Sequence, residues 1–238
     1  QYPIDADEPL FKKEISATDL WKKIVHNAWK SAEPGVLFWD TILRESVPDC
    51  YADLGYRTVS TNPCGEIPLC PYDSCRLLAI NLYSYVVNPF KPDAYFDFDL
   101  FKKHVALAQR IMDDIIDLEL EKIERIMAKI DSDPENEDVK HTESVLWQKI
   151  YKKSGQGRRT GVGITAEGDM LAALGLRYGT EEATEFAEKV HQTVALSAYR
   201  SSVEMAKERG AFEVYDSERE KNNPFINRLR EADPELYE

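Results

Sequence analysis

The chain has 238 residues, 43% of them hydrophobic, and its 43 acidic against 30 basic residues give a formal net charge of −13. This length can bury the core of one domain or of two small ones. The negative charge disfavours a DNA- or RNA-binding protein, because such proteins present a basic face. No long apolar run and no charged-then-apolar leader occurs, so we expect no membrane span and a cytoplasmic location. Since the first residue is Gln1, we also expect the chain to be a piece of a longer protein.

The predicted secondary structure begins with a helix that starts at Thr18 or Asp19 and ends before Pro34 and Gly35. A nearly continuous apolar run follows at residues 36–39 and predicts a strand that is covered on both faces. Four large aromatic side chains of this region are expected to fill the core: Trp21, Trp29, Phe38 and Trp39.

A short strand at residues 57–60 is predicted to lead into a loop, and residues 77–87 form a second strand-like run. Asp97 or Asp99 then caps a long amphipathic helix whose apolar positions continue to Ile130. The acidic run at residues 131–138 predicts a solvated loop.

The last part of the chain predicts a short strand at residues 160–165, a helix at 168–174 closed by Gly175, and a long helix at 181–209 ended by Gly210. Strands that alternate with helices are typical of an α/β fold with parallel strand pairing.

The most informative segment reads Thr-Asn-Pro-Cys-Gly-Glu-Ile-Pro-Leu at residues 61–69. Its proline and glycine residues disfavour a helix. In an extended or looped backbone, side chains at alternate positions point to the same side, which brings an amide, a thiol and a carboxylate together. These groups belong to Asn62, Cys64 and Glu66, and they outline an active site. Their simpler interpretations are a turn former, a small buried thiol and a surface or capping carboxylate.

The cysteines are clustered at Cys50, Cys64, Cys70 and Cys75. Without a secretory leader, this cluster favours catalytic, metal-binding or redox chemistry over structural disulfides. Zinc is disfavoured because the intervals lack the short C-x₂₋₄-C spacing and no histidine lies nearby. We therefore expect no metal site, and none of the four scattered histidines is expected to be a ligand.

A second motif, Gly-Arg-Arg-Thr-Gly-Val-Gly, occupies residues 157–163. It lacks the Gly-Lys-Ser/Thr ending of a phosphate-binding loop, so a nucleotide cradle is disfavoured. Its glycines instead predict close backbone packing at a strand, with Arg158 and Arg159 at the start of that strand.

Both motifs, in this order, resemble the large catalytic chain of ribonucleotide reductases. The resemblance continues through Pro-Tyr-Asp-Ser-Cys at residues 71–75, Ala-Ile-Asn-Leu at 79–82 and Gly-Asp-Met-Leu at 168–171. The short interval from Cys64 to Cys75 is most similar to the adenosylcobalamin-dependent branch. The similarity covers most of residues 15–215, which is a central slice of a much longer family chain.

The resemblance implies that residues 1–238 are part of a ten-stranded α/β barrel, the catalytic domain of the family. An inward-pointing finger loop is then expected at about residues 57–76. Residues of about 119–155 depart from the family pattern, and we interpret them as a surface insertion.

The resemblance also implies a function: conversion of ribonucleotides to 2′-deoxyribonucleotides by thiyl-radical chemistry. Cys64 would become the thiyl radical that abstracts the 3′ hydrogen of the ribose. Glu66 would act as the general base on the 3′ hydroxyl, and Asn62 would hydrogen-bond the ribose hydroxyls. Cys75 would be one of the two cysteines that reduce the substrate, with its partner outside this sequence. Cys70 is expected to be a spare core thiol and Cys50 an incidental residue of a variable loop.

Several partners are implied in the same way. They are a ribonucleotide substrate, a thioredoxin-type or dithiol reductant, nucleotide effectors bound by segments outside this chain, and further copies in a homo-oligomer. Adenosylcobalamin would be bound by the full-length enzyme and not by this chain alone, which we expect to be inactive. Two alternatives remain: the large chain of a di-iron-linked reductase, and a non-catalytic thiol or metal interaction module. The choice between diphosphate and triphosphate substrates stays open.

Overall fold

The computed structural model describes residues 7–74 and 76–237 of the chain. These residues divide into two compact units, Gln1–Ile42 and Leu43–Glu238.

The first unit contains the helix α1 (Ala17–Ser31), which begins one or two residues earlier than predicted. The side chain of Ser16 caps it by accepting a hydrogen bond from the Asp19 amide at 3.2 Å. None of the residues of α1 is buried. The helix therefore presents its apolar side chains at the surface of this unit.

The strand predicted at residues 36–39 is wrong. Residues 33–38 form no regular element, and α2 (Trp39–Glu45) begins where the strand was expected, with the Ile42 amide donating to the Phe38 carbonyl. A short apolar run cannot distinguish a buried strand from the start of a helix. The prediction of a core role for the four aromatic residues is also wrong, since Trp29 is 80% exposed, Phe38 73%, Trp21 59% and Trp39 37%.

A parallel pair of strands lies at the centre of the second unit. β3 (Leu77–Asn81) pairs with β6 (Gly161–Thr165) in a register that runs from Leu77 opposite Gly161 to Asn81 opposite Thr165. This pairing confirms the predicted parallel α/β arrangement. The predicted strand at residues 77–87 is broken after Asn81, whose side chain accepts a hydrogen bond from the Tyr83 amide at 3.0 Å and turns the chain.

Close backbone packing, predicted for the glycine-rich second motif, is confirmed at Gly161. A Cβ atom on this residue would lie 2.6 Å from the Arg76 carbonyl oxygen, which is closer than such atoms approach in proteins. Only glycine therefore lets β6 start directly beside the residue that precedes β3.

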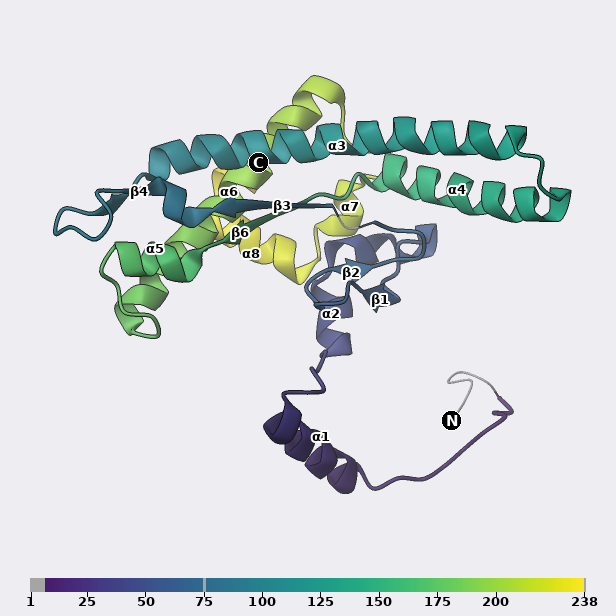
Figure 1. Cartoon of the computed structure of the whole chain (residues 1–238), viewed down its shortest axis with the longest axis horizontal. Coiled ribbons are helices and arrows are strands. Elements are labelled where there is room, and N and C mark those ends of the chain that lie inside the picture. Colours follow the sequence, from purple (N-terminus) through teal and green to yellow (C-terminus); the bar gives the residue numbers. More distant parts are fainter. Residues whose placement is uncertain (1–6, 75, 238) are drawn as a thin grey trace. The chain divides into compact units, whose positions relative to one another are not determined.

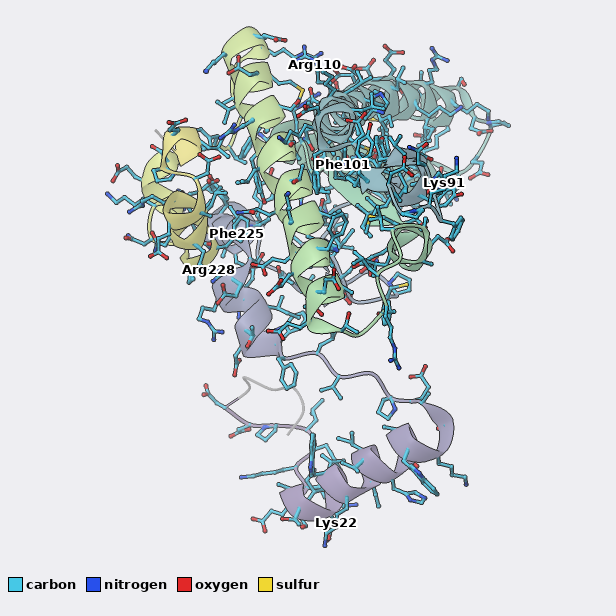
Figure 2. All side chains as sticks on the ribbon, turned by 90° about the vertical axis from the view of Figure 1, so that its left-hand side faces the viewer. Lys22, Lys91, Phe101, Arg110, Phe225 and Arg228 are labelled. Atoms are coloured by element: carbon cyan, nitrogen blue, oxygen red, sulfur yellow. The ribbon has the colours of Figure 1, made fainter. Side chains whose placement is uncertain are left out.

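Two long helices cover this pair of strands (Figure 1). α3 (Phe98–Ser132) is capped by Asp97, which accepts a hydrogen bond from the Leu100 amide at 2.9 Å, and α6 (Glu181–Arg209) has the predicted bounds. Phe101 of α3, labelled in Figure 2, is fully buried in the core between the strands and the helices. Arg110, also labelled there, forms an ion pair with Glu208 and joins α3 to α6.

The acidic run predicted as a loop is only partly a loop. The chain turns after Ser132 and enters α4 (Glu137–Gly157), which runs back alongside α3 as a helical hairpin (Figure 1). Asn136 caps α4 by accepting from the Asp138 amide at 2.8 Å. Glu137 and Asp138 belong to the first turn of α4, because negative charge is favourable at the amino end of a helix.

The remaining elements are short. They are η1 (Val47–Leu54), β1 (Ser60–Thr61), β2 (Pro68–Leu69), η2 (Leu82–Tyr85), β4 (Val86–Val87), β5 (Tyr95–Phe96), α5 (Glu167–Ala173), α7 (Ser217–Glu220), α8 (Pro224–Ala232) and α9 (Pro234–Tyr237). Apart from β3 and β6, the strands of the described residues form two antiparallel pairs, β1 with β2 and β4 with β5. In the described part of the chain, none of the helices has the length and apolar character needed to cross a bilayer.

Candidate functional site

Cys64 lies at the tip of a small antiparallel hairpin. β1 and β2 pair with Ser60 opposite Leu69 and Thr61 opposite Pro68, and residues 62–67 connect them. The Gly65 amide donates to the Asn62 carbonyl at 3.0 Å, and Gly65 has φ +84°, in the left-handed region that favours glycine. Pro63 and Cys64 are therefore the central residues of a tight turn. We call residues 60–69 the Cys64 hairpin.

The side chain of Asn62 closes this turn. The Asn62 amide donates to the Ile67 carbonyl at 3.1 Å, and the Ile67 amide donates to Oδ1 of Asn62 at 3.0 Å. The turn-forming interpretation of Asn62 is thus realised, and its amide NH₂ group remains as the donor that a ligand could use.

Cys64 and Glu66 are both exposed, and Asn62 is half-buried. The tip is a turn and not an extended strand, so strict alternation of side chains does not describe it. One short turn carries the amide, the thiol and the carboxylate. The thiol of Cys64 is accessible from outside the hairpin tip.

Cys75 lies outside the described residues. Its neighbours Asp73 and Ser74 precede it, and Arg76 follows it directly before β3. The Asp73 carboxylate accepts a hydrogen bond from the Ser74 amide at 2.9 Å and is only 5% exposed. The backbone directly before Cys75 is therefore held by a buried side chain.

Arg159 connects the two segments that carry the predicted catalytic cysteines. Its guanidinium group forms an ion pair with Asp73 and donates to the Pro68 carbonyl of β2 at 2.8 Å. Planar guanidinium groups suit such two-point contacts.

Arg76 forms a second network one residue after Cys75. Its side chain is 6% exposed and forms an ion pair with Glu119 of α3. It also donates to Oγ of Ser154 on α4 at 2.8 Å and to the Arg159 carbonyl at 3.0 Å. A buried guanidinium group needs such partners, because an unpaired buried charge is costly.

Arg158, the neighbour of Arg159, points to different partners. It donates to Asp113 and Asp117 of α3, at 2.7 Å each. Desolvation lowers the pKa of Arg158, but the hydrogen bonds that Arg158 donates to Asp113 and Asp117 outweigh it and raise that pKa above its ordinary value. Both arginines lie just before β6, as predicted, and both are bound to acids of this chain.

The other two cysteines are packed into the protein. Cys70 is 5% exposed in a cluster with Tyr51 and Tyr56, and burial, reinforced by Asp73, raises its pKa to about 11. Cys70 is thus a core thiol, as predicted. Cys50 belongs to η1 and not to a loop; its sulfur accepts a hydrogen bond from Nδ2 of Asn223 at 3.7 Å, and burial raises its pKa.

Three hollows of the second unit lie away from the Cys64 hairpin tip. One of about 490 Å³ is lined by β6 and α6, a larger one of about 890 Å³ by α3, α6 and the segment after α6, and one of about 400 Å³ by Tyr56, Tyr72 and α4. Asn62, Cys64 and Glu66 line none of the three. Among the described residues, no cluster of three or more His, Cys, Asp or Glu side chains is arranged to hold a metal ion.

The sequence analysis missed Asp73, Arg76 and Glu119 as parts of this site. One signal was available: Arg76 directly precedes the predicted apolar strand at residues 77–87, and a charge at that position requires an acidic partner from elsewhere in the fold.

The profile of the ribonucleotide reductase barrel domain matches residues 2–233 of the chain. The chain belongs to this family. The match confirms the resemblance inferred from the two motifs, and an α/β barrel domain agrees with the parallel β3–β6 pair covered by α3 and α6.

Relatives of this ribonucleotide reductase barrel domain include vitamin B12-dependent enzymes. A vitamin B12-dependent ribonucleoside-diphosphate reductase of Thermoplasma acidophilum is 36% identical over 210 residues, which are 88% of this chain and 23% of that protein. One of Mycobacterium tuberculosis (strain CDC 1551 / Oshkosh) is 31% identical over 206 residues, 86% of this chain and 25% of the relative. A ribonucleoside-diphosphate reductase subunit alpha of Chlamydia pneumoniae is 26% identical over 216 residues, which are 89% of this chain and 18% of that protein. The chain thus spans a quarter or less of the length of these relatives.

Proposed function

We propose that this chain is the central part of an adenosylcobalamin-dependent ribonucleotide reductase, which converts ribonucleotides to 2′-deoxyribonucleotides. The observation that carries the proposal is the exposed thiol of Cys64 on a tight turn between Asn62 and Glu66, in a chain of this family. Two of the relatives are named ribonucleoside-diphosphate reductases and vitamin B12-dependent, which favours a diphosphate substrate and the cobalamin branch.

The barrel is the first element of this proposal. β3 and β6 would be two neighbouring strands of a ten-stranded barrel, with the Cys64 hairpin as the finger loop at about residues 57–76 that points into it. Strands from outside this chain would complete the wall. Residues of about 119–155, which form most of the α3–α4 hairpin beyond the first part of α3, would be a surface insertion outside the wall that departs from the family pattern.

Cys64 would carry the radical. The S–H bond of a cysteine is weak enough to give up its hydrogen atom, and the resulting thiyl radical takes the 3′ hydrogen of the ribose. A turn fixed by three hydrogen bonds suits this role, because the sulfur must hold one position relative to the substrate. At the end of the reaction, Cys64 returns the hydrogen atom to the 3′ carbon.

Glu66 and Asn62 would act on the ribose hydroxyls. The carboxylate of Glu66 takes the proton of the 3′ hydroxyl, and the 2′ hydroxyl leaves as water with a proton from a thiol of the reducing cysteine pair. The free NH₂ group of Asn62 donates to a ribose oxygen, while its carbonyl oxygen keeps the turn closed.

Cys75 would belong to the cysteine pair that supplies two electrons to the substrate and becomes a disulfide. Its partner would come from another part of the enzyme. A thioredoxin-type protein or a small dithiol would then reduce this disulfide. Nucleotide effectors would bind to other segments, and the complete enzyme would be a cytoplasmic homo-oligomer.

The described residues fit one side of a cobalamin-dependent site. The exposed Cys64 thiol is a hydrogen-atom donor that a group bound at the hairpin tip can reach. When bound, adenosylcobalamin supplies the radical that starts the chemistry. The corrin ring would be held by other parts of the complete enzyme.

A di-iron-linked large chain is the second candidate, since a relative from Chlamydia pneumoniae is named as a subunit alpha. Its identity of 26% is below the 36% and 31% of the two vitamin B12-dependent relatives.

The test is an assay of the complete reading frame. The purified enzyme is incubated with a labelled ribonucleoside diphosphate and a dithiol, with and without adenosylcobalamin, and deoxyribonucleotide is measured. We expect product only with the cofactor. Equal turnover without it would reject the cobalamin branch, and no turnover under either condition or with a di-iron subunit would reject the reductase function.

A further inference from the structure

We propose that Arg159 is a positioning residue of this enzyme: it holds the Cys64 hairpin and the segment before Cys75 in one fixed arrangement. The inference rests on the proposed function for its catalytic consequence. It assigns the second motif a task that the resemblance to the family does not provide.

The contacts of Arg159 reach one side of the hairpin. One nitrogen of its guanidinium group is paired with Asp73, and another donates to the Pro68 carbonyl at 2.8 Å. Pro68 pairs with Thr61, which directly precedes the turn that carries Cys64. A displacement of Arg159 therefore moves the base of the turn and the approach to Cys75 together.

The segment that leads into the hairpin, at Gly55 and Tyr56, is held by α4. Nζ of Lys153 donates to the Gly55 carbonyl at 2.7 Å and lies 3.7 Å from the centre of the Tyr56 ring. A Cβ atom on Gly157 would meet that ring at 3.0 Å, so helix and ring are in close contact. The residues just before β1 are thus fixed to the same helix end that carries Arg159.

Arg159 is held in place by its own backbone. Its carbonyl oxygen accepts a hydrogen bond from Arg76, which is anchored to Glu119 of α3 and Ser154 of α4. Residues 119–155, predicted as a surface insertion, therefore reach the candidate active site through buried and partly buried contacts.

Arg158 provides a matched comparison. It has the same charge, it is the adjacent residue, and it is also paired with two carboxylates, Asp113 and Asp117. Its partners are both on α3, so its loss weakens the contact between α3 and the end of α4 without removing a contact to the Cys64 hairpin.

Substitution of Arg159 should loosen the hairpin and lower kcat by about 100-fold, because a misplacement of about 1 Å at a reacting group costs about that much. KM should change little, since Arg159 touches no proposed substrate group. Arg159→Lys should be intermediate, because an ammonium group can satisfy one of the two acceptors but lacks the planar fork that reaches both.

The first experiment uses the 238-residue chain and measures amide hydrogen exchange by mass spectrometry. In Arg159→Gln, peptides covering residues 58–70 should exchange faster than in the wild type, while α6 peptides stay unchanged. In Arg158→Gln, peptides 58–70 should exchange as in the wild type. Unchanged exchange of these peptides in Arg159→Gln would overturn the inference, as would equal acceleration in both variants.

The second experiment measures kcat and KM of the same variants in the complete enzyme. The inference is supported if kcat falls in Arg159→Gln, recovers in part in Arg159→Lys and does not fall in Arg158→Gln. An equal loss of kcat in Arg159→Gln and Arg158→Gln overturns it. If the wild-type enzyme reduces no ribonucleotide, the proposed function fails, and the exchange experiment still decides whether Arg159 holds the hairpin.

Discussion

Tyr51 donates a hydrogen bond from its hydroxyl group to Oε1 of Glu220, 2.5 Å away. The pair joins η1 to α7, two elements separated by most of the second unit's sequence. Burial raises the pKa of Glu220; the Tyr51 hydrogen bond opposes this shift, and the nearby charge of Asp216 adds to it. The folded protein therefore binds the Glu220 proton more tightly than the unfolded chain does.

This pair predicts a pH dependence of stability. The stabilisation of the fold by the protonated Glu220 carboxyl is complete below pH 4.5, the pKa of this group in the unfolded chain. It is lost as the pH rises through the raised pKa of Glu220 in the folded protein. Glu220→Gln stays neutral and keeps an oxygen acceptor for Tyr51. Its melting temperature relative to the wild type should therefore increase between about pH 4 and about pH 8. Glu218→Gln, on the same helix but exposed, is the control; a difference for Glu220→Gln that does not vary with pH would contradict the prediction.

Gly161→Ala should destabilise the fold by about 1–3 kcal/mol, the usual cost of inserting a methyl group into a packed region. The reason is the 2.6 Å approach of the new Cβ atom to the Arg76 carbonyl. Gly163→Ala, on the same strand, is the control, since its nearest atom would lie 3.9 Å away. Urea unfolding of both variants measures the difference. Equal midpoints would show that β3 and β6 can move apart at no cost.

Cys64→Ser should abolish deoxyribonucleotide formation by the complete enzyme. The O–H bond of serine is too strong to replace the S–H bond as a hydrogen-atom donor. Because Cys64 is exposed, the variant should fold and melt like the wild type. Cys50→Ser, which removes a thiol outside the hairpin, should keep activity. Normal turnover by Cys64→Ser would end the thiyl-radical hypothesis.

Glu66→Gln should slow the loss of the 2′ hydroxyl by about 10²- to 10⁴-fold, the range for removal of a general base. The neutral amide cannot take the 3′ proton, but radical formation at Cys64 does not need it. Rapid-quench measurement of water loss, compared with exchange of the 3′ hydrogen, separates the two steps. A parallel fall in both rates would instead assign Glu66 to the placement of the turn.

The 238-residue chain alone should form no deoxyribonucleotide, even with adenosylcobalamin and a dithiol. None of the three hollows described above includes Cys64, and the chain spans a quarter or less of its relatives. Exposed apolar side chains such as Trp29 and Phe38 should also promote self-association. Product analysis and light scattering measure the two effects, and turnover by this chain would show that its active site is more complete than proposed.

Some elements could be predicted from residues close together in the sequence, and others could not. The bounds of α6 and the cap of α3 at Asp97 follow from residues within one helical turn, which is why the sequence predicts them. The prediction of a strand at residues 36–39 was wrong because the conformation of a short apolar run depends on the elements that pack against it. The contact between Arg159 and Asp73 spans 86 residues, and no local pattern encodes such a pairing. The turn at Cys64 was therefore predictable from its proline and glycine residues, whereas the contacts that hold the hairpin were not.

The Glu119–Arg76 ion pair divides the α3–α4 hairpin into two parts that differ in how many insertions and deletions they can tolerate. A single deletion in α3 before Glu119 would rotate every later residue of that helix by about 100° and carry the carboxylate away from Arg76. Beyond Glu119 and Ser154, the two helices continue side by side toward their connection, away from the Cys64 hairpin (Figure 1). Insertions and deletions next to the connection of the two helices would leave the contacts of Arg76, Lys149 and Lys153 in place. The outer part is also the natural place to shorten the protein or to attach a fusion partner.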